Sequence, residues 1–294
     1  MENKVINSRR AFTIWELLFL LFIIFLLFSL LMPSLSKSRS RAVVIVCQHC
    51  LHSYSTAGQA FLNDNDDYFP EPNEWLYSGL SVNESHPIGC RWHDGQMSLQ
   101  SETMEGKQEY YGKMEKYFDE KYTRGCPVFI NIARFRGCEN PNHNENIPVE
   151  PQYSYTMNAY LGGKQNGSVQ KSNEVRNPAK VFFFAEENSW TLSPNHPKYK
   201  AEWLKKPLST KALDDTVLYI SSTSEARDCF ATYHDARDLN SGSSNVVFID
   251  GHVNSVSSHE QSPKTRFSSS TFGTAGNLSL AWASKNLPPD GLGE

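Results

Sequence analysis

The stretch that decides the fold is FTIWELLFLLFIIFLLFSLLMP, residues 12–33, in which Ser29 is the only polar residue after position 16. As an α-helix, residues 12–32 span about 31 Å, which is close to the thickness of the hydrocarbon core of a bilayer. Arg9 and Arg10 precede the run and favour a cytoplasmic N-terminus, although basic residues at 37, 39 and 41 follow it. The sequence predicts one transmembrane helix.

A cleaved secretory signal peptide is the alternative for this segment. Signal peptides usually have an apolar region of about 7–15 residues that ends at a small-residue cleavage site. The apolar run here is longer, and residues 33–42, PSLSKSRSRA, offer no clear site of that kind. We therefore favour a helix that stays in the membrane.

Glu16 does not fit a plain membrane anchor, because an ionised carboxylate in an apolar run is costly without a partner. It either lies close enough to the interface to reach water or meets a positive charge. Residues 9–18, RRAFTIWELL, followed by Pro33, resemble the type IV prepilin segment, which has a basic leader, a cleavage point, then Phe and a nearby Glu. The resemblance implies that a prepilin peptidase cuts between Ala11 and Phe12 and that the new amine of Phe12 is N-methylated.

Cleavage at this point implies a role for Glu16 in assembly. The ammonium group of Phe12 can pair with Glu16 of a neighbouring subunit, but only at one axial offset of the two helices. The resemblance also implies that Pro33 kinks the helix. Two residues depart from the family pattern: Ala11 stands where the family nearly always has glycine, which implies slower cleavage, and Trp15 replaces a small or aliphatic residue.

Past Pro33 the helix is predicted to resume, because apolar residues recur at helical spacing on one face: Val43, Cys47, Cys50, Tyr54, Ala57 and Phe61. We expect one helix from 12 to about 62, bent or loosened at Pro33, with its second half packed on a sheet. Residues 63–67, NDNDD, predict a turn that ends the helix. Calcium is the alternative there, but the segment lacks the glycine and the final glutamate of an EF-hand loop.

The remaining chain predicts an α+β domain with an antiparallel sheet. Residues 70–150 look irregular, with a helix around 104–120, and strands are predicted at 153–160, 181–184 and 216–220. Asp250 and Gly251 separate two apolar runs and predict a hairpin with a two-residue turn. Residues 261–294 are rich in Ser, Thr, Gly and Pro and predict an extended or partly disordered tail.

These elements predict a five-part organisation of the chain. Residues 1–11 form a leader, 12–33 the transmembrane helix, and 34–63 its amphipathic continuation. Residues 64–260 form an extracytoplasmic globular domain, and 261–294 form the tail.

Three further blocks resemble a large group of bacterial prepilin-type proteins: residues 47–70, residues 153–158 (YSYTMN) and residues 245–253 (NVVFIDGHV). Members of that group often carry a histidine nine residues before Asp-Gly. Here the nearest such histidine is His234, with 15 residues between, and residues 239–244 look like an insertion. In its anchor this group resembles the pseudopilins of type II secretion, and the resemblance implies a pilin-like fold.

Few residues of the sequence suggest metal binding, catalysis or disulfide formation. His234, Asp250 and His252 are residue types that suit a metal or a general base, but the hairpin turn already explains Asp250. There are six cysteines, which allow 15 full pairings. Cys126 and Cys138 can close a small disulfide loop. The CxxC at 47–50 lacks a second pair for zinc and a βαβ context for redox chemistry.

No phosphate-binding loop, GxSxG or HExxH motif occurs, and the net charge of −4 gives no basic stripe for nucleic acid. We therefore expect a non-enzymatic, pilin-like or pseudopilin subunit in the inner membrane, without a cofactor. Its expected partners are a prepilin peptidase and other pilin-like subunits. The alternatives are an unpolymerised single-pass binding module and a tethered metal hydrolase that uses His234, Asp250 and His252.

Overall fold

A computed structural model of the chain describes residues 13–76, 112–118, 125–136, 154–164, 167–187, 216–220, 230–231, 233–234, 242–257 and 280–285. The chain divides into two compact units, Met1–Val43 and Val44–Glu294. Helix α1 (Ile14–Asp64) supplies residues to both units. This confirms the long N-terminal helix predicted from 12 to about 62.

The first unit contains the apolar part of α1. Its large apolar side chains from Ile14 to Leu35 are all exposed. The helix is long and apolar enough to span a membrane or to be a signal sequence. Pro33 lies inside the helix without interrupting it, although it cannot donate a backbone hydrogen bond.

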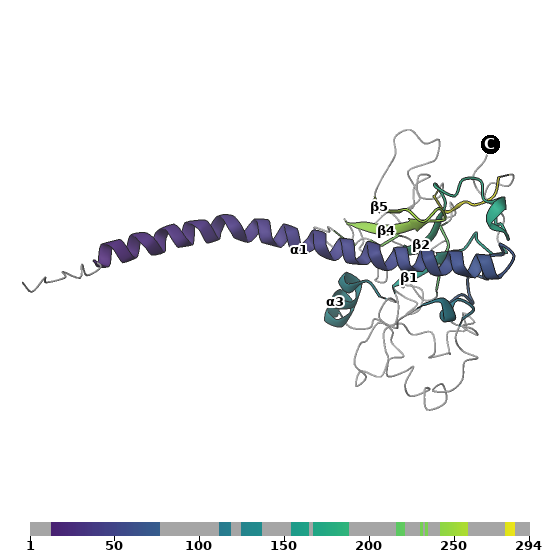
Figure 1. Ribbon diagram of the computed structural model, residues 1–294, viewed down its shortest axis with the longest axis horizontal. Coiled ribbons are helices and arrows are strands. Elements are labelled where there is room, and N and C mark those ends of the chain that lie inside the picture. The colour runs from purple at the N-terminus through teal and green to yellow at the C-terminus, as the bar shows by residue number, and fades with distance from the viewer. Residues whose placement is uncertain are drawn as a thin grey trace, which may run out of the picture. The chain divides into compact units, whose positions relative to one another are not determined.

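The second unit is built on a five-stranded sheet in the order β3-β1-β2-β4-β5. Figure 1 labels four of these strands, β1, β2, β4 and β5. The strands are β1 (Tyr155–Asn158), β2 (Phe182–Glu186), β3 (Val217–Leu218), β4 (Ser243–Phe248) and β5 (Val253–Ser257). Neighbouring strands are antiparallel except β1 and β3, which pair in parallel. The predicted α+β class is confirmed, and each predicted strand is present, although β3 is shorter than expected.

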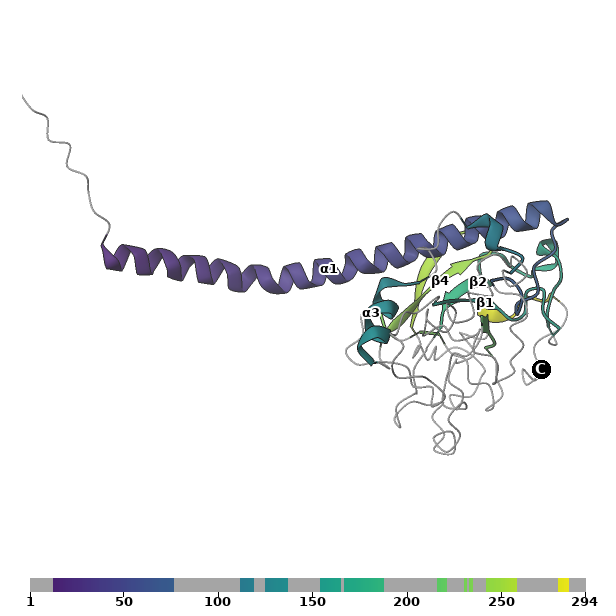
Figure 2. The same cartoon turned by 90° about the horizontal axis from the view of Figure 1, so that it is seen from below.

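The distal part of α1, residues 44–64, lies across one face of this sheet (Figure 2). Its buried apolar side chains are Cys47, Leu51, Tyr54, Ala57, Phe61 and Leu62. Four of these belong to the face predicted from the sequence, while Val43 and Cys50 are only half-buried. Burial of this face is the main force that attaches the helix to the sheet.

A β-bulge shapes the contact between α1 and the sheet. Phe182 pairs with Phe248 and Phe184 pairs with Val247, so Phe183 is an extra residue in β2. The bulge breaks the usual alternation of side chains, and the rings of Phe183 and Phe184 stack with centroids 4.3 Å apart. The Phe183 ring lies directly against Gly58 of α1, where a Cβ atom would come within 2.3 Å of it.

We expect Gly58→Ala to destabilise the protein. Alanine improves helix propensity by about 1 kcal/mol, but overpacking a buried ring typically costs about 1–3 kcal/mol, and Phe183 is fully buried. The predicted net loss is up to about 2 kcal/mol in urea unfolding of the detergent-solubilised chain. Thr56→Ala, on the exposed face of the same turn, is the control and should change stability by less than about 0.5 kcal/mol. A Gly58→Ala protein more stable than the parent would show that Phe183 moves aside freely.

The turn predicted at residues 63–67 is confirmed. Helix α1 ends at Asp64, and Asp66 and Asp67 adopt positive φ angles of 51° and 64°. The backbone N–H of Asp67 donates to Leu62 O at 3.0 Å and thereby caps the helix end. The acidic residues are thus explained as turn residues.

The region from 70 to 150 is partly described. Only a short 3₁₀ helix, η3 (Glu115–Tyr117), falls within the helix predicted around 104–120; residues 104–111 and 119–120 lie outside the described residues. Helix α3 (Pro127–Arg136) was not predicted. Trp75 is fully buried, and its indole N–H donates to Thr216 O at 2.9 Å.

The predicted hairpin is present, but its loop is longer than the two residues expected. The strands end at Phe248 and begin again at Val253, and Gly251 has a φ of 93°. Ile249 is buried, and its N–H donates to Val181 O at 3.1 Å. Because Ile249 is held by the core, it does not continue strand β4, and the loop is therefore longer than two residues.

Part of the predicted tail belongs to the folded domain. Residues 280–285 pack near the 3₁₀ helix η5 (Ser172–Glu174), where Arg176 N donates to Ala283 O at 2.9 Å. The Asn158 side chain donates to Ala281 O at 2.8 Å, and Ala281 is fully buried. The expectation of an extended or disordered tail is wrong for these residues, while 261–279 and 286–294 lie outside the described residues.

Candidate functional site

Glu16 lies in the first turn of α1 and forms a local capping arrangement. The N–H and the hydroxyl of Thr13 both donate to Glu16 Oε2, each at 2.9 Å. The N–H of Glu16 donates in return to the Thr13 hydroxyl oxygen at 3.3 Å. This reciprocal pattern is a capping box, which satisfies backbone N–H groups at a helix start. Ala11 and Phe12 lie outside the described residues, so their pairing and processing stay predictions.

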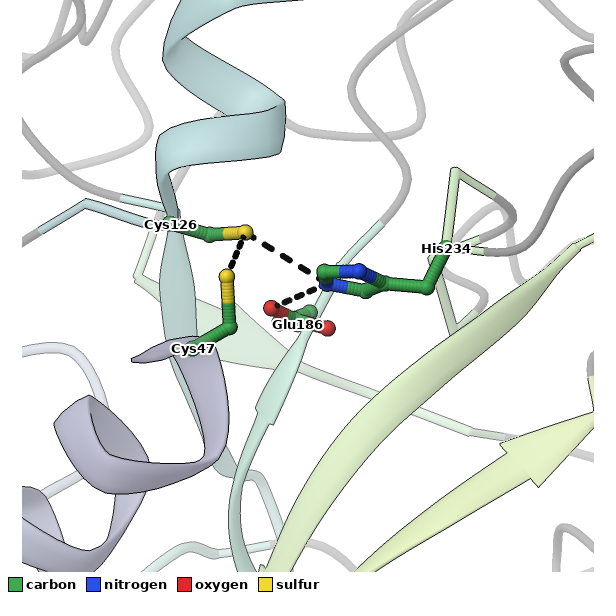
Figure 3. A group of neighbouring side chains, drawn as sticks. All are labelled: Cys47, Cys126, Glu186 and His234. Atoms are coloured by element: carbon green, nitrogen blue, oxygen red, sulfur yellow. Dashed lines mark hydrogen bonds and ion pairs between the residues drawn. The ribbon is translucent and has the colours of Figure 1, made fainter. Parts of the chain in front are cut away.

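A second group of side chains, all of types that can bind a metal, is buried in the domain, and we call it the buried cluster: Cys47, Cys126, Glu186 and His234. Cys47 comes from α1, Cys126 directly precedes α3, and Glu186 ends β2. His234 comes from a segment that forms an isolated antiparallel bridge with Ser243 of β4. All four residues are almost fully buried, and Figure 3 shows their side chains pointing toward one another.

The ligand atoms of the buried cluster lie within 4.8 Å of one another. The two sulfur atoms are 2.6 Å apart, and Cys126 Sγ is 3.4 Å from His234 Nε2. The same nitrogen lies 2.8 Å from Glu186 Oε1. These distances bring four residues of metal-binding type to one point.

No protein family, curated protein or solved structure matches this chain.

Backbone contacts hold the side chains in place. The N–H of Asn245 donates to Glu186 Oε2 at 2.7 Å, so the other carboxylate oxygen is directed at His234. The N–H of Cys126 donates to the Ser154 hydroxyl at 2.6 Å, and Cys126 O accepts from Ile130 N at 3.0 Å. The buried cluster is therefore fixed by the sheet and by the first turn of α3.

The ionisable groups of the buried cluster change one another's pKa. Burial lowers the pKa of His234, but the negative charge of the Glu186 carboxylate, with hydrogen bonds that the ring donates to Cys47 and Glu186, outweighs burial and raises the pKa to about 10. A hydrogen bond from Cys126 lowers the pKa of Cys47 to about 7, against the effect of burial. Burial raises the pKa of Cys126 well above its ordinary value. The His234 ring and the Glu186 carboxylate thus form a close pair beside the two sulfur atoms.

The structure does not bring together the three residues considered for metal or base chemistry from the sequence. Asp250 and His252 form their own exposed pair in the hairpin loop, with Nδ1 and Oδ1 2.6 Å apart. The His252 ring also stacks on Phe248 with centroids 4.3 Å apart. His234 belongs to the buried cluster, which is the only such group of His, Cys, Asp and Glu among the described residues.

Among the described residues, Cys126 lies beside Cys47. The disulfide between Cys126 and Cys138 stays a prediction, because Cys138 lies outside the described residues. Cys50 is half-buried, and burial raises its pKa. Sequence reasoning missed Glu186 completely, because it ends an apolar strand and belongs to no motif. The only sequence signals were the position of Cys47 on the buried face of α1 and the unusual place of His234.

Proposed function

We propose that the chain is a pilin-like or pseudopilin structural subunit of a type II secretion or type IV pilus-like assembly. The observation that carries the proposal is the surface of α1: its large apolar side chains from Ile14 to Leu35 are all exposed, and Glu16 is the only charged residue in that range. So large an apolar surface needs lipid or the helices of neighbouring subunits to cover it. The distal part of the same helix packs on a sheet, as in a pilin-like subunit.

The proposed subunit is made as a precursor in the inner membrane, with its N-terminus in the cytoplasm and its globular domain outside. A prepilin peptidase removes residues 1–11, and the Phe12 amine pairs with Glu16 of the next subunit in the apolar helix bundle. The role is structural, and no catalytic residue is assigned. Two sequence features support this proposal: the basic residues before Ala11 and the acidic side chain of Glu16.

Mass spectrometry of the protein extracted from membranes tests this function. A mature chain that starts at N-methyl-Phe12 is expected. An intact Met1 terminus in all chains would instead support the second candidate, a static membrane anchor that carries an extracytoplasmic binding module. The alanine at position 11 is the observation that favours this second candidate.

Ala11→Gly should raise the fraction of processed chains severalfold when the protein is expressed together with a prepilin peptidase. Glycine has no Cβ, so it fits most easily where an extended chain must enter a narrow cleavage site. Ala11→Leu is the matched control and should almost abolish cleavage. The ratio of precursor to mature chain, measured by intact mass, gives the result. Equal processing of the three proteins would mean that no peptidase recognises this position.

A further inference from the structure

We propose that the buried cluster binds one structural zinc ion through Cys47, Cys126, Glu186 and His234. This inference is independent of the pilin-like role, because all four residues lie within the Val44–Glu294 unit. It concerns how the domain is held together and assigns no catalytic activity.

The donor set and its spacing fit zinc. Thiolate sulfur, imidazole nitrogen and carboxylate oxygen are the ligands that Zn²⁺ takes in proteins. In a tetrahedral site with Zn–S bonds of about 2.3 Å and Zn–N bonds of about 2.0 Å, the ligand atoms lie about 3–4 Å apart. The four atoms of the buried cluster lie within 4.8 Å of one another, with the closest pair 2.6 Å apart. Small side-chain rotations therefore suffice to place an ion between them.

Charge and burial support the same conclusion. Glu186 is 0% exposed and His234 is 1% exposed, so neither side chain can be solvated by water. An ionised carboxylate and thiolates this close together in a low-dielectric interior need a compensating cation. A divalent ion compensates all of them at once, whereas an imidazolium at His234 brings a single positive charge to the carboxylate and the sulfur atoms together.

The surroundings indicate a structural site. Four protein ligands complete a tetrahedral shell, and the burial of all four leaves no open position for water or substrate. The ligands come from α1, the start of α3, the end of β2 and the segment beside β4 (Figure 3). One ion would thus join segments that are far apart in the sequence, and would lock the distal part of α1 to the sheet.

A disulfide between Cys47 and Cys126 is the competing explanation. Such a bond is permitted outside the cytoplasm, and the sulfur atoms are neighbours. It would use two of the four residues and leave the Glu186–His234 pair facing an uncharged disulfide. Zinc uses all four residues, which is why we favour it.

The test uses the full chain in detergent, purified without a histidine tag. Cells are lysed in an alkylating reagent to record the native thiol state, and a parallel batch is kept in a phosphine reductant for metal analysis. We expect about one zinc per chain and no Cys47–Cys126 disulfide. Replacement of zinc by cobalt should give a visible d–d spectrum and a thiolate-to-cobalt charge-transfer band in the near ultraviolet.

Matched variants locate the site. Cys47→Ser and His234→Ala should lose most of the zinc and lower the thermal midpoint. Cys50→Ser, one turn along α1, and His252→Ala, the exposed hairpin histidine, should keep it. If the site variants fail to fold, the cobalt spectrum of the unmodified chain still decides.

Three results would each overturn the proposal. The first is a reduced chain that takes up no stoichiometric metal when zinc is supplied. The second is a Cys47–Cys126 disulfide in most chains alkylated at lysis. The third is a cobalt spectrum without the thiolate band.

Discussion

Replacing Glu16 by glutamine should abolish subunit assembly and leave cleavage after Ala11 intact. The capping box with Thr13 needs an acceptor oxygen at position 16, and a glutamine side chain provides one. The start of α1 is therefore kept, while the negative charge that pairs with the Phe12 amine of the next subunit is lost. Loss of one partner of a buried charge pair lowers assembly by more than about tenfold. The amount of subunit in sheared filaments or cross-linked multimers measures assembly, and intact mass measures cleavage.

Thr13→Ala is the matched control for this experiment. It removes the hydroxyl that donates to Glu16 and accepts from its N–H, but it keeps the carboxylate. Assembly close to that of the parent is expected, because the charge pair does not need the hydroxyl. If Thr13→Ala loses assembly while Glu16→Gln keeps it, the glutamate acts as a helix cap and the register role is wrong.

Tyr54→Ala should destabilise the domain by about 3–5 kcal/mol, since truncating a large buried aromatic residue leaves a cavity in the core. Tyr54 is fully buried on α1. Its ring centroid lies 4.8 Å from Phe118, 4.9 Å from Tyr155, 5.6 Å from Phe184 and 5.8 Å from Trp75. The side chain thus links the helix to the sheet and to two loops. Domains are stable by only about 5–15 kcal/mol, so this loss removes a large share of the total.

Urea unfolding of the full chain in detergent, followed by tryptophan fluorescence, measures the effect. His52→Ala, which lies on the exposed face two residues earlier, should stay within about 0.5 kcal/mol of the parent. Tyr54→Phe keeps the ring and should cost clearly less than Tyr54→Ala. A Tyr54→Ala protein as stable as His52→Ala would mean that the distal part of α1 does not depend on this aromatic contact.

The second half of α1 shows what periodicity predicts well. Cys47, Tyr54, Ala57 and Phe61 recur at helical spacing, and all four are buried against the sheet. The same pattern could not show that Gly58 is needed, because its reason is the Phe183 ring, which a β-bulge places against it. A bulge depends on the register between strands, and no local sequence pattern encodes it.

The hairpin and the tail show features that the local sequence did not predict. The Asp250–Gly251 pair correctly predicted a turn, but its length was decided by Ile249, which the core retains through Val181. Residues 280–285 lie in a tail rich in Ser, Thr, Gly and Pro, yet they supply carbonyl acceptors to Asn158 and Arg176. Composition reports how much apolar surface a segment can bury, and it does not report which polar backbone groups another segment needs.

The sequence by itself determined the N-terminal helix, its exposed apolar surface, the carboxylate at Glu16 and the α+β class, because these depend on hydropathy and on periods of a few residues. Only the tertiary structure decided that Cys47, Cys126, Glu186 and His234 meet at one point. Cys47 and Cys126 are 79 positions apart, and Cys126 and His234 are 108 apart. Contacts over such separations arise from the packing of α1, α3 and the sheet together, so they become visible only when the chain is folded.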